Sequence, residues 1–458
     1  MNIIQKIKKN LILLLSLALL CATVTGCSSG VRLNPKNPVT ITMWHNYGGQ
    51  MQNTMDQLID EFNSTVGKEK GIIVSVTSIS AFRDVEEKLR MIAEGDPGAP
   101  EMPDITPAYP RNAMLLSEYE LIIGLDEQFT EEELGAYLPQ FVDEGRLPDG
   151  KLYVFPFAKS TEVLFVNQTL FDRFAADTGV TLESLATFEG IAQAAITYAR
   201  WTDDQTPDIP GDGAAFYTAD SWFNIAMVGT KQMGADFVAE DTLRTHDDIY
   251  RRVWDFAVQP ALSGGFAVVD GYSSDLSKTG EIICSTGSTA GILFYGDSVT
   301  YPDNTTEAVT YTVLPYPTFA GGEKIALQRG SGLVVARSTP EKEYAAALFL
   351  KWFTQPLQNM RLVASTGYLP VTREAFEKNM KEEIGAIENS NVKRLLEAAT
   401  QMYSAYDFIT APNYDSFDAM SKEYETTWKE ALREGCARVE AGENPEAVGQ
   451  ELWQAFAR

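Results

Sequence analysis

The amino-acid sequence predicts an α/β protein built from two domains. Short β-branched stretches alternate with segments whose apolar residues recur at helical spacing, which is typical of a parallel sheet covered by helices on both faces. The chain has 458 residues, of which 45% are hydrophobic, so it can bury a core larger than one ordinary domain needs. We therefore expect two α/β domains, either consecutive or interleaved.

The first elements follow one another as strand, helix and strand. Residues 39–43 alternate as a strand does, apolar residues over 51–62 repeat at helical spacing, and residues 72–76 are again β-branched. A second helix with an apolar face over 82–92 precedes a short strand around 104–105. This order predicts a βαβ unit that continues into the same sheet.

The same alternation returns late in the chain. Residues 332–336 predict a buried strand, and Thr339 with Pro340 predicts the cap and the first residue of a helix that reaches about residue 353. Apolar residues over 417–432 recur along one face of a further long helix. The end of the chain is therefore expected to pack as helices on one domain.

The first 38 residues predict export rather than a folded element. A basic start is followed by an apolar run from Leu11 that is shorter than the roughly 17–25 residues needed to cross a bilayer. The small residues before Cys27 resemble a bacterial lipobox, which implies cleavage before Cys27 and acylation of its sulfur. We expect a signal peptide over 1–26, a polar tether over 27–38 and a lipid anchor at the extracellular face of the cell membrane. A soluble secreted protein that is cleaved elsewhere is the alternative.

Charge and composition exclude several classes of function. The net charge of −26 becomes −29 when the signal and its three lysines are removed, so nucleic acid and anionic membrane surfaces are repelled. The chain has two histidines, His45 and His246, and no Cys-x-x-Cys or His-Glu-x-x-His spacing. We therefore expect neither a metal nor a cofactor. Cys284 and Cys436 are expected to be buried thiols, with a disulfide between them as the less favoured alternative.

Several segments of the chain resemble the family 1 extracellular solute-binding proteins, which serve importers of sugars and of glycerol 3-phosphate. The resemblance extends over about 330 residues, and the order of the matching segments makes it more specific than any one of them. These segments are ITMWHNYGGQM from Ile41, GKLYVFPFAKSTEVLFVNQTLF from Gly150, GSTAGI from Gly287, LKWFTQP from Leu350 and STGYLPVT from Ser365.

This resemblance implies a two-lobe fold of the type II periplasmic-binding-protein class, with a hinge and a ligand cleft between the lobes. Lobe 1 would comprise residues 39–157 plus 308–361, and lobe 2 residues 158–307 plus 362–458. The implied partners are a small-molecule sugar and the membrane permease subunits of an ABC importer, and the implied state is a monomer without enzymatic activity.

A sugar has apolar C–H faces and a rim of hydroxyls, so its site needs flat aromatic rings together with paired polar groups. Matching the family segments and the corners after predicted strands gives a set of ligand-binding candidates. For the aromatic residues and the hydroxyls the alternatives are core packing and turn capping, respectively. The candidates are Trp44, Tyr47, Ser160, Thr161, Glu162, Trp222, Ser288, Arg329, Gly330 and Tyr368, with Asp104, Tyr109 and Arg111 as weaker ones.

One departure from the glycerol-3-phosphate binders concerns ligand charge. Those proteins carry an arginine in a proline-containing corner near the C-terminus, and the comparable corner here, residues 411–417, has an aspartate and no arginine. The departure favours a neutral sugar or oligosaccharide, although Arg329 leaves a phosphate ester open as the alternative.

A secreted glycoside hydrolase is the rival of another class. The 63 acidic residues allow a catalytic carboxylate pair, whose presence sequence alone does not reveal. No Gly-x-Ser-x-Gly nucleophile elbow is present, and a Ser-His-Asp triad would have to use one of just two histidines. The sequence therefore favours a binding protein over an enzyme.

Overall fold

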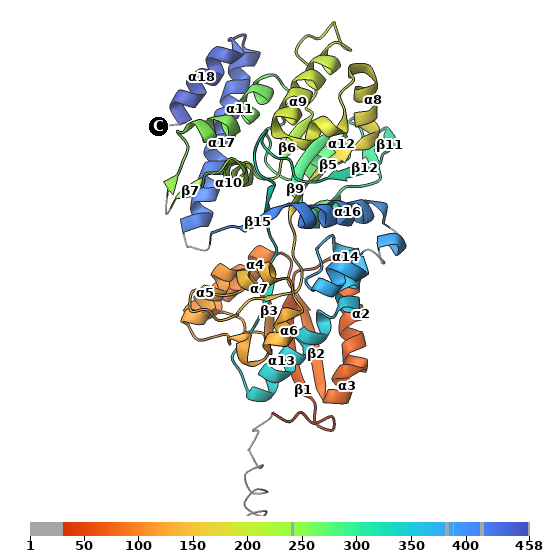
Figure 1. Cartoon of the computed structure of the whole chain (residues 1–458), viewed down its shortest axis with the longest axis vertical. Helices are drawn as coiled ribbons and strands as arrows, with labels where there is room; N and C mark the ends of the chain where they lie inside the picture. Colours follow the sequence, from red (N-terminus) through yellow and green to blue (C-terminus); the bar gives the residue numbers. More distant parts are fainter. Residues whose placement is uncertain (1–30, 240–241, 381–383, 388, 413–415, 457–458) are drawn as a thin grey trace, which may run out of the picture.

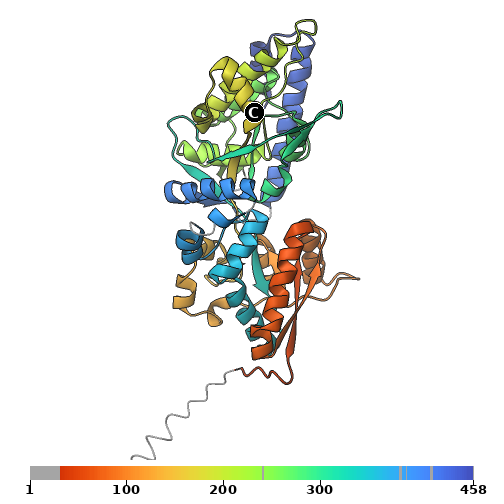
Figure 2. The same cartoon turned by 90° about the vertical axis from the view of Figure 1, so that its right-hand side faces the viewer.

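The computed structural model describes residues 31–239, 242–380, 384–387, 389–412 and 416–456. They form two α/β lobes stacked along the long axis of the molecule and joined at a narrow waist (Figures 1 and 2). Lobe 1 contains the first strand, and lobe 2 contains the C-terminal helices. The predicted signal peptide and Cys27 lie outside the described residues, and among those that are described no helix is both long and apolar enough to span a bilayer.

Lobe 1 is built on a five-stranded sheet in the order β2-β1-β3-β14-β4. β1 runs parallel to β2 and β3, whereas β14 runs antiparallel to β3 and β4. The prediction of a parallel sheet therefore fails at β14 alone, which returns from the other lobe and runs opposite to the other four strands. The strands are β1 (Val39–His45), β2 (Ile72–Ser78), β3 (Ile105–Ala108), β4 (Phe155–Pro156) and β14 (Gly332–Val335).

The helices of lobe 1 begin where the sequence signals place them. Thr339 caps α13 by accepting a hydrogen bond from the Lys342 amide, and Pro340 is its first residue, as predicted. The helices are α2 (Gly49–Ser64), α3 (Val66–Lys70), α4 (Phe82–Glu94), α5 (Pro110–Glu118), η1 (Leu125–Glu127), α6 (Glu131–Gly135), α7 (Pro139–Glu144), α13 (Pro340–Phe353), α14 (Pro356–Thr366) and the π-helix η4 (Ala375–Asn379).

Lobe 2 has a four-stranded sheet in the order β12-β5-β9-β6. β5 (Glu162–Asn167) carries the chain into the lobe and runs antiparallel to both neighbours, β12 (Tyr311–Leu314) and β9 (Cys284–Ser288). β6 (Tyr217–Ala219) is parallel to β9. Short hairpins are added to this sheet, and the one made by β10 and β11 projects from the lobe (Figure 2). The remaining strands are β7 (Val238–Ala239), β8 (Thr242–Leu243), β10 (Ser298–Thr300), β11 (Thr306–Ala308), β13 (Ile325–Gln328) and β15 (Asp407–Thr410).

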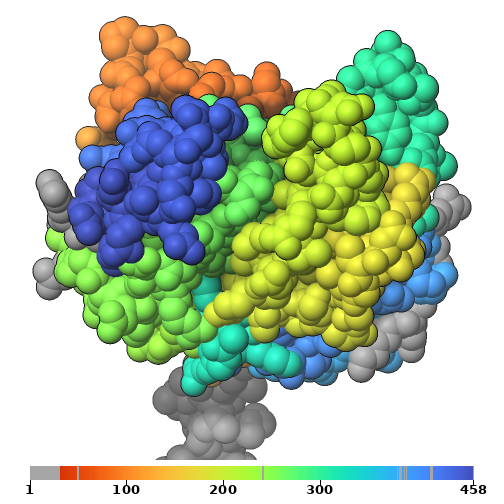
Figure 3. Space-filling view, turned by 90° about the horizontal axis from the view of Figure 1, so that it is seen from above, coloured from red at the N-terminus to blue at the C-terminus, as the bar shows by residue number. Residues whose placement is uncertain are grey.

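Helices cover lobe 2 and form two ridges at its outer end, α8–α9 on one side and α17–α18 on the other (Figure 3). A furrow of about 960 Å³ lies between α9 and α17 and belongs to this lobe alone. The helices are α8 (Gln168–Thr178), η2 (Leu182–Ala186), α9 (Phe188–Asp203), α10 (Trp222–Gln232), α11 (Asp248–Leu262), α12 (Ser273–Thr279), η3 (Thr289–Phe294), η5 (Ile384–Ala386), α16 (Ser390–Ala405), α17 (Ser416–Glu440) and α18 (Pro445–Phe456).

The strand pairing moves the predicted lobe boundaries. β12 pairs with β5, so the chain returns to lobe 1 only after Gln328 and not at residue 308. Val371 accepts a hydrogen bond from the Leu138 amide, and Thr372 bridges to Tyr137, so this stretch still belongs to lobe 1 beyond residue 361. The polar pattern around these crossings gave no signal of where the chain changes lobes.

The chain segments that cross between the lobes are hydrogen-bonded to one another. Ser160 and Arg329 exchange backbone hydrogen bonds of 2.9 and 2.7 Å, and Lys159 pairs in the same way with Leu369. β13 and β15 run parallel beside them. We call segments 157–161 and 328–331 the hinge.

Candidate functional site

Two of the predicted aromatic platforms are core residues. Trp44 is 8% exposed and packs with Val85 and Leu89 of α4. Trp222 is 2% exposed and stacks among Tyr217 and Trp428 in lobe 2. The end of β1 and the first turn of α10 direct these rings into the two cores, which is the core-packing alternative, and their role in ligand binding stays a prediction.

Tyrosines from three loops of lobe 1 gather beside the hinge. The Tyr47 ring meets the Tyr368 ring edge-on at 6.2 Å and the Phe157 ring at 6.5 Å. Burial, with the nearby phenols of Tyr368 and Tyr109, raises the pKa of Tyr47 well above its usual value. Burial also raises the pKa of Tyr368 to about 12, so all these hydroxyls stay protonated at physiological pH. They can both donate and accept hydrogen bonds.

Charged and amide groups face the tyrosines from lobe 2 and the hinge. The Glu162 carboxylate, 3% exposed at the start of β5, accepts hydrogen bonds from Asn224 Nδ2 at 2.6 Å and from Arg329 at 3.0 Å. Burial raises the pKa of Glu162, and the Arg329 guanidinium opposes that rise. The Arg329 side chain is 39% exposed, so one end of it is held while the rest stays open to a ligand.

A second ionic network holds the hinge itself. The buried Lys159 ammonium donates to Glu144 Oε2 and to the Gly330 carbonyl, both at 3.0 Å. The Gln328 amide also donates to Glu144. Gly330 has a φ of 103°, and a Cβ there would lie 2.7 Å from the Ala158 carbonyl oxygen, so only glycine fits this crossing.

A cleft of about 270 Å³ opens between the lobes at this point. It is lined by Tyr109 and Glu144 of lobe 1, Asn224 and Phe417 of lobe 2, and Arg329 of the hinge. Across it, Arg111 of α5 forms ion pairs with Glu86 and with Asp418 of α17. Glu162 does not line the cleft but contacts two residues that do, Asn224 and Arg329. The furrow in lobe 2 is larger, but its walls come from lobe 2 alone, whereas the cleft has walls from both lobes.

Comparison with known proteins identifies the family. Residues 57–389 match the model of the bacterial extracellular solute-binding proteins. The chain belongs to this family.

Relatives and solved structures agree with this assignment. The glycerol-3-phosphate-binding periplasmic protein UgpB of Brucella abortus is 21% identical over 363 residues, which cover 75% of this chain and 77% of that protein. The cyclic α-maltosyl-1,6-maltose binding protein of Arthrobacter globiformis superposes with a TM-score of 0.68 at 18% identity, covering 92% and 98% of the two chains. UgpB of Mycobacterium tuberculosis, solved in complex with glycerophosphocholine, superposes with a TM-score of 0.64 at 16% identity and also covers 92% of this chain and 98% of that chain. These matches confirm the predicted two-lobe fold.

Not every predicted polar residue of this solute-binding protein is available to a ligand. The Thr161 hydroxyl donates to the Leu327 carbonyl at 2.9 Å, so it ties the hinge together. Asp104 precedes β3 and Tyr109 follows it, so the two residues lie at opposite ends of that strand. The Asp104 carboxylate accepts hydrogen bonds from Thr42 and Lys342, and its prediction as a cleft residue is wrong. Ser288 caps η3 by accepting from the Ala290 amide, and it stands opposite Glu162 in the β5–β9 pair.

Some cleft residues of this solute-binding protein were not among the candidates. Asn224 lies one turn into α10, Glu144 ends α7, and Phe417 and Asp418 start α17. Each sits near a helix end, and the sequence offered two signals, the strand-to-helix corner before Asn224 and the proline-containing corner over 411–417. Glu144 and Asp418 meet the cleft through contacts more than 180 residues apart in the chain, which local patterns do not report.

Proposed function

We propose that this solute-binding protein is a lipid-anchored receptor that captures a neutral sugar or oligosaccharide and delivers it to an ABC importer. The observation that carries the proposal is that Tyr109 of lobe 1 and the pair Asn224 and Arg329, which Glu162 holds, line one interlobe cleft. Tyr47 and Tyr368 lie close to Tyr109. Aromatic rings suit the C–H faces of a pyranose, and a carboxylate with an amide suits its vicinal hydroxyls. Several structural neighbours are described as binding maltose or related glucans.

The charge state of the cleft distinguishes a sugar from a phosphate ester. Relatives named for glycerol 3-phosphate keep that ligand as the second candidate. Here, however, the half-exposed Arg329 is already paired with the buried Glu162, and Glu144 and Asp418 add further negative charge to the walls. A dianionic phosphate would have to compete with carboxylates for both guanidinium groups of the cleft, because Arg111 is also already paired, with Glu86 and Asp418. A neutral polyhydroxylated ligand meets no such repulsion.

Anchoring through Cys27 and the absence of catalysis belong to the same proposal. The basic start, the apolar run and the lipobox-like residues support export and acylation, and the tether would leave both lobes free above the membrane. The family and the structural neighbours are solute-binding proteins, which supports capture rather than hydrolysis. Mass spectrometry of the membrane-extracted protein should show an acylated Cys27 at its N-terminus, and an unmodified N-terminus at another residue would contradict anchoring.

Calorimetric titration with neutral oligosaccharides and with glycerol 3-phosphate tests the ligand class. We expect saturable binding of a neutral sugar that is recovered unchanged, and a hydrolysed product would instead support the glycosidase. Glu162→Gln should weaken sugar binding, because a carboxylate acceptor is lost. If glycerol 3-phosphate alone binds, and binds more tightly to Glu162→Gln because Arg329 is released, the second candidate replaces the first.

Two tyrosines of the same helix provide a matched pair for this titration. Tyr109 caps the start of α5 and lines the cleft, whereas Tyr119 caps its end and is 50% exposed away from the cleft. Tyr109→Ala should lose roughly 2 kcal/mol of binding free energy, as an aromatic anchor does, and Tyr119→Ala should lose none. Equal affinities for the two variants would remove Tyr109 from the site.

A further inference from the structure

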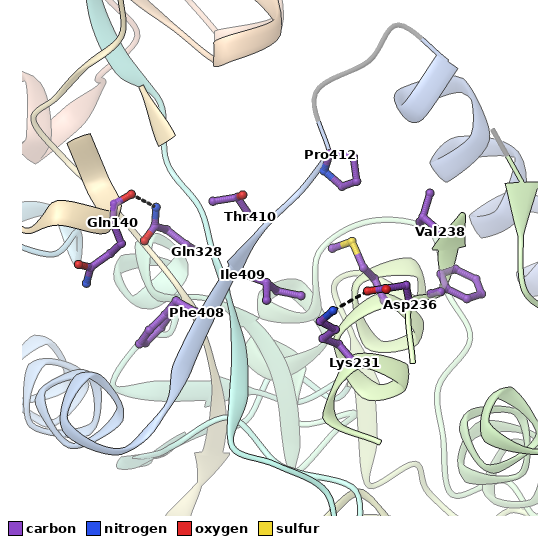
Figure 4. Close-up of a pocket in the computed structure, with 11 residues that line it drawn as sticks. Gln140, Lys231, Asp236, Val238, Gln328, Phe408, Ile409, Thr410 and Pro412 are labelled. Carbon is purple, nitrogen blue, oxygen red and sulfur yellow. Dashed lines mark hydrogen bonds and ion pairs between the residues drawn. The ribbon is translucent and has the colours of Figure 1, made fainter. Parts of the chain in front are cut away.

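The cleft adjoins a second space along the same helix of lobe 2. This space, about 370 Å³, is lined by Gln140 of α7, Met227 and Lys231 of α10, and residues of β15 (Figure 4). It shares Gln328, Thr410 and Pro412 with the cleft. We call it the α10 groove.

The helix geometry makes the cleft and the α10 groove one continuous channel. Asn224, Met227 and Lys231 of α10 are spaced three and four residues apart, so they share one face of the helix. Asn224 lines the cleft, and the other two line the groove. On the opposite wall Glu144 and Gln140 of α7 are four residues apart. Glu144 lines the cleft, and Gln140 lines the groove. Two facing helices therefore run past both spaces.

The lining of the groove is apolar with a few polar groups, and its charges cancel. Met227 and Phe237 are buried, and Phe408 and Ile409 of β15 add apolar surface. Lys231 is paired with Asp236 at 2.6 Å, so the groove offers no free charge among the groups that line it. Such a surface suits an uncharged segment with apolar faces.

Gln328 brings an unpaired hydrogen-bond acceptor to the groove. Its side chain is 3% exposed, and its Nε2 donates to the Gln140 carbonyl and to Glu144. Its Oε1, however, has no partner within the described part of the chain, although it is fully buried. A buried acceptor without a donor is costly and uncommon in folded proteins, and a ligand hydroxyl would satisfy it.

We propose, on the basis of the proposed sugar-binding function, that the ligand is a linear, uncharged oligosaccharide that extends from the cleft into the α10 groove. Gln328 and Met227 then contact the later sugar units and so favour longer ligands, whereas the cleft binds the first unit. The cleft alone, at about 270 Å³, lies just below the roughly 300–1,000 Å³ typical of small-molecule sites, and the added volume of the groove brings the two together into that range. The Gln328 oxygen would accept from a hydroxyl of a later unit.

A ladder of linear glucose oligomers, from the disaccharide to the hexasaccharide in α-linked and β-linked series, tests this by calorimetric titration of the full-length protein. Wild-type affinity should rise by about tenfold or more along one of the series. Val238→Trp, which fills the groove from β7 and does not line the cleft, should abolish this rise while leaving disaccharide affinity within about twofold. Gln328→Met removes the acceptor and should reduce the rise, but Gln328 also lines the cleft, so disaccharide affinity is expected to fall with it. Ile73→Trp, at a half-exposed strand position of lobe 1, is the matched control and should keep the rise.

Each outcome bears on one of the two proposals. If the disaccharide binds but affinity does not rise with length, or rises equally in Val238→Trp, the extended ligand is wrong while sugar capture stands. If no neutral sugar of either series binds the wild-type protein, sugar capture itself fails and the extended ligand with it. Should Gln328→Met alter the hinge, its thermal stability will fall, and Val238→Trp then decides, because Val238 lies outside the hinge.

Discussion

The hinge and the mouth of the cleft are both held by ion pairs, but the two regions differ in burial. At the hinge the Lys159 and Glu144 side chains are 2% and 9% exposed. At the mouth the Arg111 and Asp418 side chains are 33% and 60% exposed. A buried charge must keep its partner to remain in the fold, whereas an exposed pair can break and re-form in water. The comparison indicates that the hinge maintains the architecture and that the mouth is where the lobes can separate.

Removing the buried ammonium is the severest test of this comparison. Lys159→Met leaves Glu144 buried without its cation, and we expect a loss of roughly 3–5 kcal/mol in the free energy of unfolding. Chemical denaturation followed by tryptophan fluorescence measures this loss. Lys278→Met is the matched control, because Lys278 also pairs with a carboxylate at 3.0 Å but is 47% exposed, and its loss should stay below about 1 kcal/mol. Similar losses in the two variants would show that burial does not separate the two kinds of pair.

The hinge glycine should be the next most sensitive position. In Gly330→Ala the new Cβ would press on the Ala158 carbonyl oxygen at 2.7 Å in addition to adopting a positive φ. Gly95→Ala also places alanine at a positive φ but meets no atom within 4 Å. The left-handed backbone alone costs roughly 1–2 kcal/mol of stability in both variants. Gly330→Ala should lose more stability than Gly95→Ala, because it adds the steric clash with the carbonyl oxygen. Equal melting temperatures of the two variants would mean that the hinge backbone shifts to accommodate the new Cβ at little cost.

A pH titration tests whether the tyrosine wall depends on one buried imidazole. Burial lowers the pKa of His45 below its usual value of 6.5, and its Nδ1 accepts a hydrogen bond from the Tyr47 amide at 3.2 Å. The unfolded chain takes up a proton as the pH falls through 6.5 while the folded chain resists, so stability declines from that pH down to the folded pKa.

His45→Asn keeps an acceptor for the Tyr47 amide but does not titrate. The melting temperature of the wild type should therefore fall more steeply between neutral pH and about pH 5 than that of the variant, and identical slopes would mean that His45 titrates alike in both states.

The difference between the two regions also explains what the sequence could predict. Local patterns located β1, α2, β14 and α13, because alternation, helical spacing and the Thr339–Pro340 cap act within a few residues. They could not place the return to lobe 1, since β12 is assigned to lobe 2 only by its pairing with β5. The same limit affected the site: an aromatic residue after a strand can join the tyrosines beside the hinge, as at Tyr47, or pack in the core against α4, as at Trp44, and the local sequence does not distinguish the two.

Breaking the ion pair at the mouth should have the smallest effect on stability and a specific effect on closure. Asp418→Asn leaves Arg111 paired with Glu86 in lobe 1, so the free energy of unfolding should change by at most about 1 kcal/mol. Because the lost contact joins the two lobes, bound ligand should dissociate up to about fivefold faster, as measured by stopped-flow fluorescence.

Glu94→Gln breaks a comparably exposed pair with Arg90 inside lobe 1 and should leave the dissociation rate unchanged. Salt near 1 M, where the screening length is only about 3 Å, should bring the wild type to the rate of Asp418→Asn. If Glu94→Gln accelerates release as much, or if salt leaves the wild-type rate unaltered, the exposed pair at the mouth contributes nothing to holding the lobes together, and closure must rest on the ligand and the hinge alone.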